Sequence, residues 1–208
     1  MNKLIAFVWL LGLTATYAHA QKLKKTKIND EITVKIPEDF IVMSDREYRQ
    51  EFAGYRKPVA MYRQESSKAT FGINTALTHA PPGTRQTFVD NKGKMRKHQA
   101  EWSINDLKMM KSLYKSTILR LHSNVRFKQD KIETIRKRNF VVLEFVGTVK
   151  NEEKSMIGKS KGTLKQYSYI MYTVKDSKIY IFNFTCPAKR ISRWKKPVYD
   201  MMHSIRIR

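Results

Sequence analysis

The chain has 208 residues, with 41 lysines and arginines against 18 aspartates and glutamates, which gives a formal charge of +23. Its 8 glycines, 6 prolines and single cysteine exclude a collagen, a low-complexity chain and a small disulfide-stapled fold, and an aromatic content of 11% favours a chain with a hydrophobic core. We therefore expect one strongly basic globular domain, and this composition indicates the charge of a partner rather than a biochemical activity.

The first twenty residues have the pattern of a secretory signal peptide. Lys3 precedes an apolar run of ten residues at positions 4–13, and Ala18 and Ala20 supply the small residues that precede a cleavage point. A run of that length is too short to cross a bilayer, which takes about 20 apolar residues. We expect residues 1–20 to be removed after Ala20, the protein to be periplasmic or secreted, and the mature chain to have no transmembrane span.

The mature chain is expected to begin with a flexible basic lead-in over residues 21–30, followed by a single globular domain over residues 31–208. Ile32, Val34 and Ile36 alternate with polar residues and predict a strand with one buried face. The next elements are a short helix and two strands, predicted at residues 45–52, 59–63 and 69–78.

The strongest helical pattern begins after Trp102. Ser103 and Asp106 have the spacing of a capping box at a helix N-terminus. Apolar residues follow at helical spacing, at positions 107, 110, 113 or 114, 118 and 121. Three lysines share another face of this helix, where like charges repel one another unless water or an anion surrounds them. These anion-binding candidates are Lys108, Lys111 and Lys115.

The second half of the chain is mostly β. Residues 140–146 are apolar on both faces apart from Glu144, which is typical of a covered strand, and β-rich runs at 167–174 and 179–186 predict a hairpin. A second amphipathic helix follows, with Ser192 as its expected N-cap. Its apolar residues are Trp194, Val198, Met201 and Ile205. This order predicts an α+β fold, a largely antiparallel β-sheet packed against two or more helices.

Two residues lie in sequence contexts that suggest catalysis, but neither has the surroundings that the chemistry needs. Ser160 is the centre of a G-x-S-x-G string, yet a polar turn precedes it and a β-rich run follows, whereas a hydrolase needs a strand-to-helix elbow. Cys186 ends an apolar strand, where a buried thiol is favoured over a nucleophile. The histidines lack metal-ligand spacing. We expect no catalytic residue, metal or cofactor, with a small hydrolase using Cys186 or Ser160 as the alternative.

The basic residues are distributed along the chain, so the charge is expected to draw the protein to anionic surfaces. For an exported protein such a surface is an anionic envelope component or an acidic partner protein, and no RNA-binding signature points to nucleic acid. The plainer interpretation is that the charge serves solubility alone. A third interpretation is an NTF2-like cone that holds an apolar ligand, lined by Tyr167, Tyr169 and Phe182. The sequence leaves the ligand and the oligomeric state open.

Two stretches resemble the PsbP-like family of exported proteins. The first is residues 32–40, a strand that runs into proline and an aromatic residue. The second is the hairpin at 166–186 with the helix that follows it and the closing residues 204–207. The resemblance covers most of residues 32–207 and implies an α/β/α sandwich with a non-enzymatic accessory or binding role and no catalytic residues. We therefore expect an exported, non-catalytic binding protein of the cell envelope that docks by its basic surface.

Overall fold

The structure is a computed structural model of the full chain. It describes residues 21–51, 56–78, 85–89, 92–99, 102–150, 163–176 and 178–208. The expected signal peptide with its cleavage point at Ala20, and the expected turn that carries Ser160, lie outside these residues.

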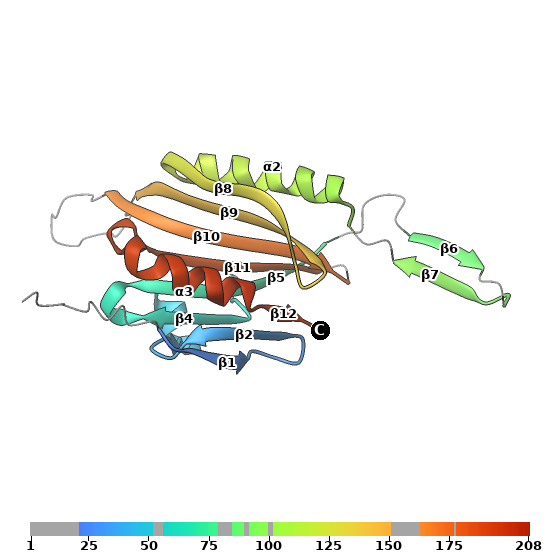
Figure 1. The fold of residues 1–208 in the computed structure, drawn as a ribbon, viewed down its shortest axis with the longest axis horizontal. Coiled ribbons are helices and arrows are strands. Elements are labelled where there is room, and N and C mark those ends of the chain that lie inside the picture. The colour runs from blue at the N-terminus through green and yellow to red at the C-terminus, as the bar shows by residue number, and fades with distance from the viewer. Residues whose placement is uncertain are drawn as a thin grey trace, which may run out of the picture.

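A seven-stranded antiparallel sheet forms the centre of the molecule (Figure 1). Its strand order is β3-β4-β5-β11-β10-β9-β8. The strands are β3 (Ile41–Val42), β4 (Ala60–Gln64), β5 (Ala69–Leu77), β8 (Ser123–Ile135), β9 (Arg138–Lys150), β10 (Thr163–Lys175) and β11 (Lys178–Pro187). Strands β8 to β11 follow one another as antiparallel neighbours, an arrangement that needs no long crossover connection. The largely antiparallel sheet that the sequence predicts is therefore confirmed.

One face of the sheet is covered by α2 (Ile104–Leu121) (Figure 1). The Ser103 side chain accepts a hydrogen bond from the Asp106 amide, and the Asp106 carboxylate accepts one from the Ser103 amide. The predicted capping box is therefore confirmed. The buried side of the helix packs in one apolar cluster with side chains of β9, β10 and β11. Its fully buried residues are Leu107, Met110 and Ile118.

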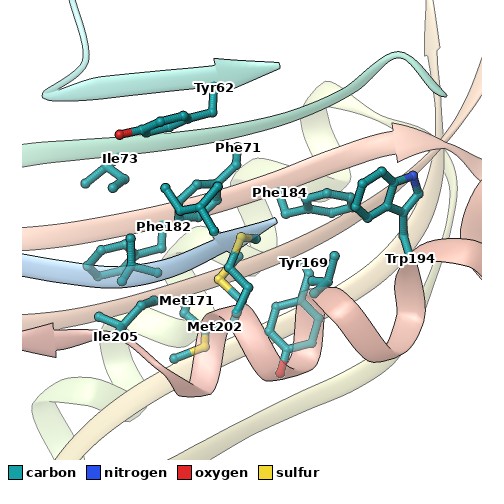
Figure 2. Packing of buried hydrophobic residues seen from close by; sticks show 14 of the residues in the cluster. Tyr62, Phe71, Ile73, Tyr169, Met171, Phe182, Phe184, Trp194, Met202 and Ile205 are labelled. Carbon is teal, nitrogen blue, oxygen red and sulfur yellow. The ribbon is translucent and has the colours of Figure 1, made fainter. Parts of the chain in front are cut away.

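The opposite face is covered by α3 (Ile191–His203) together with a second, three-stranded sheet (Figure 1). That sheet contains β1 (Leu23–Lys27), β2 (Ile32–Pro37) and β12 (Arg206–Ile207), in the order β1-β2-β12. Figure 2 shows the core between the layers, where Trp194 of α3 lies beside Phe184 of β11 with ring centroids 5.5 Å apart. Trp194 Nε1 donates a hydrogen bond to Ser67 Oγ at 3.1 Å, so the buried indole keeps its polar atom satisfied. The layers form an α/β/α sandwich.

The remaining elements are short. They are α1 (Asp45–Glu51), the single-turn helices η1 (Glu65–Ser67) and η2 (Ala188–Arg190), and the strands β6 (Arg85–Val89) and β7 (Met95–Gln99). β6 and β7 pair as a separate hairpin, which projects beyond the end of the central sheet (Figure 1). Among the described residues, no helix is long and apolar enough to cross a membrane.

Three local predictions are wrong. Ile205, expected on the apolar face of the second helix, follows α3, which ends at His203, although its side chain is buried in the core. Leu23–Lys27, expected to be part of a flexible lead-in, forms β1 and pairs with β2. Its lysines stay in solvent at the edge of the small sheet, where charged side chains suit a strand, and apolar alternation therefore does not reveal it. Arg190 rather than Ser192 occupies the N-cap position of α3, because η2 leads directly into the helix.

Candidate anion-binding site

The three lysines predicted to bind an anion lie on α2, but two of them are already paired within the chain. Lys111 Nζ lies 2.6 Å from Asp130 Oδ1 on β8, and Lys115 Nζ contacts the other oxygen of that carboxylate, Asp130 Oδ2. The Asp130 side chain is only 23% exposed, so this α2 lysine cluster (Lys111, Lys115 and Asp130) is half-buried between helix and sheet. Lys108 is exposed and has no ion pair in the described part of the chain. Two of the three lysines are therefore engaged within the chain, by one shared carboxylate.

The chemistry of Asp130 reflects this pairing. The hydrogen bond from Lys111, followed by that from Lys115, holds the pKa of the Asp130 carboxyl below its ordinary value of 3.8. Lys115 Nζ also lies 4.9 Å from the centre of the Phe127 ring, a distance that permits a cation–π contact. Both lysines have partners within the chain. An external anion would have to compete with these partners for the ammonium groups.

A second basic region lies on the opposite face of the central sheet, at the tip of the β8–β9 hairpin. A cavity of about 450 Å³ opens there between the hairpin tip, β12 and β1, and in Figure 1 the hairpin bends toward β12. Five basic residues line this cavity, which we call the arginine pocket: Lys25, Arg136, Arg138, Arg206 and Arg208. The rest of its lining is Thr33 and four apolar residues, Ile135, Phe140, Ile205 and Ile207.

The hairpin tip owes its shape to a two-residue turn. Ile135 pairs with Arg138, and the residues between them, Arg136 and Lys137, have φ angles of 51° and 65°. Left-handed backbone at both positions is the geometry of a two-residue turn that follows the natural twist of antiparallel strands. The tight turn places Arg136 and Arg138 together at the pocket.

The strand β12 brings two further arginines beside the hairpin tip. Arg206 pairs opposite Thr33 of β2, and the Arg208 amide donates a hydrogen bond to the Glu31 carbonyl oxygen at 2.8 Å. The Lys175 ammonium donates a hydrogen bond to the Arg208 carbonyl oxygen. The backbone that carries these two guanidinium groups is therefore held by the small sheet and by β10.

Two glutamates that are close in sequence to pocket residues form ion pairs with lysines outside the pocket. A carboxylate oxygen of Glu31 lies 2.7 Å from the Lys178 ammonium, and Glu133 lies 2.9 Å from the Lys131 ammonium. Within the described part of the chain, the five basic residues of the pocket form no ion pair. An α-carboxylate on the main chain of Arg208 would offset at most one of the five positive charges. The pocket therefore carries an excess of positive charge.

Cys186 has the surroundings of a core residue rather than of a nucleophile. Its side chain is 2% exposed and lies in the same apolar cluster as Trp194. Burial raises the pKa of the Cys186 thiol to about 12, which opposes formation of the reactive thiolate. The other candidate nucleophile, Ser160, lies outside the described residues. The described residues also contain no group of three or more His, Cys, Asp or Glu side chains that could hold a metal ion.

The residues expected to line an NTF2-like cavity fill the core instead. Tyr167, Tyr169 and Phe182 are at most 1% exposed and belong to one packed cluster, in which Figure 2 shows Tyr169 and Phe182. The Tyr167 hydroxyl donates a hydrogen bond to Glu144 Oε1 at 3.1 Å, and Gln129 Nε2 donates one to Glu144 Oε2 at 2.7 Å. Glu144 is thus a buried carboxylate whose two oxygens both have partners, as a structural residue requires.

The architecture was compared with solved structures. Cyanobacterial PsbP (CyanoP) from Synechocystis sp. PCC 6803 aligns with a TM-score of 0.56 and 9% sequence identity, over 90% of this chain and 94% of that chain. The fold is PsbP-like. The α/β/α sandwich of PsbP-like type that the sequence resemblance implies is therefore confirmed.

Other solved structures align more loosely with this chain. The Saccharomyces cerevisiae Ran-binding protein Mog1p aligns with a TM-score of 0.49 and 10% identity, over 90% of this chain and 96% of that chain. LpqN, described as involved in cell envelope biogenesis of Mycobacterium tuberculosis, aligns with a TM-score of 0.47 and 10% identity, over 93% and 96%. No protein-family model and no curated protein matches the sequence. At this identity the likeness concerns the PsbP-like fold and not its site residues.

The arginine pocket is the site that sequence reasoning missed. A dense basic run at Arg136–Arg138 is visible in the sequence, and so are Arg206 in the closing strand and Arg208 after it. The pairing of β12 with β2, beside the hairpin tip, is a long-range feature that residue spacing does not express. The resemblance to a PsbP-like sandwich is the signal that could reveal the pocket. Placing the basic runs on the strands of such a sandwich would bring the two groups of arginines together.

Proposed function

We propose that the protein is an exported, non-catalytic accessory or binding protein of the cell envelope that docks on an anionic membrane component through its basic surface. The observation that carries the proposal is the arginine pocket, in which five basic residues meet without an ion-pair partner among the described residues. Like charges gathered in this way repel one another, and an external anion relieves that repulsion.

Further features support a binding role. The formal charge of +23 raises the local concentration of anionic partners and accelerates encounters with them. The signal-peptide pattern of residues 1–20 supports export. The burial of Cys186, with its raised thiol pKa, opposes the hydrolase alternative.

A membrane component suits the pocket better than an acidic partner protein does. The pocket is a small hollow with about the volume of a small-molecule site, whereas a stable protein partner needs an interface of about 800 Å² on each side. Basic residues close to an anionic leaflet each contribute about 1 kcal/mol to membrane attachment. The five residues of the pocket are thus sufficient to favour attachment, although salt weakens it.

Sedimentation with lipid vesicles tests this proposal. The protein is expressed from the full sequence, with the expected signal peptide included. It is mixed with vesicles of phosphatidylcholine alone or of phosphatidylcholine with phosphatidylglycerol, at a series of salt concentrations. We expect binding to the vesicles that contain phosphatidylglycerol and progressive release as salt rises. Equal binding to both vesicle types would contradict docking by charge, and the absence of vesicle binding together with salt-dependent retention on an acidic polypeptide would redirect the proposal to an acidic protein.

A further inference from the structure

We infer that the arginine pocket is a receptor for a phosphate ester, a ligand with a phosphate group on an apolar or alcohol-bearing substituent. The inference rests on the proposed function and deepens it, because it assigns the recognition to one hollow instead of to the basic surface as a whole. The same chemistry occurs in phospholipid headgroups and in soluble phosphate esters, and the experiment below separates these two sources.

The kind of basic residue in the pocket points to phosphate. Four of its five basic residues are arginines. A guanidinium group is planar and presents its N–H donors as a fork that matches two oxygens of a phosphate, whereas an ammonium group acts as a point charge. A surface that served solubility alone would need no such convergence of guanidinium groups, and charge spread over the molecule would serve that purpose better.

The backbone at the hairpin tip supports the assignment. A two-residue turn with left-handed φ at both positions is most readily formed by Asn-Gly or a similar pair, yet this chain has Arg136 and Lys137 there with φ of 51° and 65°. A left-handed conformation is strained for a residue other than glycine, because the Cβ atom crowds the following carbonyl oxygen. Arg136, which lines the pocket, therefore stands at a position where glycine would be more stable.

The pocket is held in shape before any ligand arrives. β12 is paired with β2, the Arg208 amide is bonded to the Glu31 carbonyl, and Arg138 opens β9 opposite Ile135. Binding then requires the ordering of side chains but no ordering of backbone, which lowers its entropic cost. Because Glu31 is itself paired with Lys178, it does not compete with a ligand for the arginines.

The apolar part of the lining indicates that the ligand is more than an inorganic ion. Ile207 is half-buried and presents apolar surface in the lining, and the remaining apolar residues, Ile135, Phe140 and Ile205, add only their small exposed parts, each at most 8%. A volume of about 450 Å³ falls within the range of small-molecule sites. A phosphate held by the arginines would leave room for its substituent against these apolar side chains.

The test compares two variants that remove the same charge from different places. R138Q/R206Q removes two guanidinium groups from the pocket. R120Q/R126Q removes two exposed arginines on α2 and at the far end of β8, outside the pocket and without ion pairs in the described part of the chain. A third variant, R138K/R206K, keeps the pocket charge but loses the guanidinium fork. Circular dichroism and thermal unfolding establish that each variant is folded.

Binding is measured with two probes, glycerol 1-phosphate in solution by isothermal titration calorimetry and phosphatidylglycerol vesicles by sedimentation. For whichever probe the unmodified protein binds, we expect R138Q/R206Q to weaken binding about tenfold or more, because hydrogen bonds to charged groups are lost. R120Q/R126Q should weaken it by less than about twofold, and R138K/R206K should fall between the two. Binding of the soluble ester assigns a soluble source, and binding of the vesicles alone assigns a lipid headgroup.

The failure of this inference is distinct from the failure of the proposed function. If the unmodified protein binds anionic vesicles and the two charge-removing variants are weakened equally, the pocket assignment is overturned while docking by basic surface stands. If the unmodified protein binds neither the vesicles nor the soluble ester, both are overturned.

Discussion

The two basic regions of this molecule carry the same sign of charge but differ in what surrounds it. In the α2 lysine cluster, Lys111 and Lys115 share the carboxylate of Asp130, and all three side chains are partly buried against the sheet. In the arginine pocket, no carboxylate among the described residues forms an ion pair with the five basic residues. The first region uses its charges to attach a helix to a strand, and the second leaves them available to another molecule.

The comparison shows why a count of charges is a weak guide to function. Lysines at positions 108, 111 and 115 form a regular pattern along one helix, and the pattern predicts a basic face. The structure uses two of the three internally, through an acid on a neighbouring strand. The availability of a charge depends on such long-range partners, which outweigh local spacing because a pair that is shielded from solvent interacts more strongly than one in water.

The largest expected effect comes from breaking the α2 lysine cluster. Asp130→Ala should reduce the free energy of unfolding by about 2 kcal/mol, because two partly buried ammonium groups lose the carboxylate that they share. Urea denaturation of the full chain measures the change. The matched control is Asp200→Ala, which breaks the exposed Lys196–Asp200 pair on α3 and should alter stability by less than about 0.5 kcal/mol. Equal effects of the two variants would show that the α2 lysine cluster contributes no more to the free energy of unfolding than an exposed ion pair does.

A smaller effect should appear when the same cluster is titrated with acid. The pKa of Asp130 lies below its ordinary value of 3.8 in the folded protein, so its contribution to stability is complete above the unfolded value and is lost as the pH falls through the folded value. The difference in unfolding free energy between the unmodified protein and Asp130→Ala should therefore shrink between about pH 5 and about pH 2. Urea denaturation at several pH values measures it. A difference that stays constant over this range would refute the role of the ionised carboxylate.

The smallest effect on stability is expected in the arginine pocket. R138Q/R206Q should leave the free energy of unfolding unchanged within about 0.5 kcal/mol, or raise it slightly, because no internal partner is lost and mutual repulsion falls. Urea denaturation beside R120Q/R126Q measures the difference. A loss of more than about 1 kcal/mol would mean that these arginines hold the fold together, and would remove the contrast between the two regions.

The sequence predicts the parts of this fold that local patterns control. The capping box of Ser103 and Asp106 marks the start of α2 within one residue, and the apolar character of residues 140–146 identifies β9 as a covered strand that contributes to clusters on both faces. The hairpin of β10 and β11 follows from its two β-rich runs. In each of these cases the deciding contacts lie close together in the chain.

The parts that the sequence does not predict depend on distant partners. β1 is a polar edge strand that pairs with β2 along its whole length, and it lacks an apolar pattern of its own. The sequence does not predict the hairpin of β6 and β7, which lies beyond the central sheet. The arginine pocket joins the beginning, the middle and the end of the chain through β1, β9 and β12, and no window of sequence contains all three.

The single cysteine of the chain lies in the interior cluster that also holds Trp194. In oxidising surroundings a closed molecule therefore offers no thiol to an oxidant or to a second chain, and disulfide cross-linking is confined to molecules whose sandwich has opened. A thiol-specific dye added to the native protein would be consumed only as fast as that opening occurs. The rate at which Cys186 is labelled thus reports the rate at which the core opens.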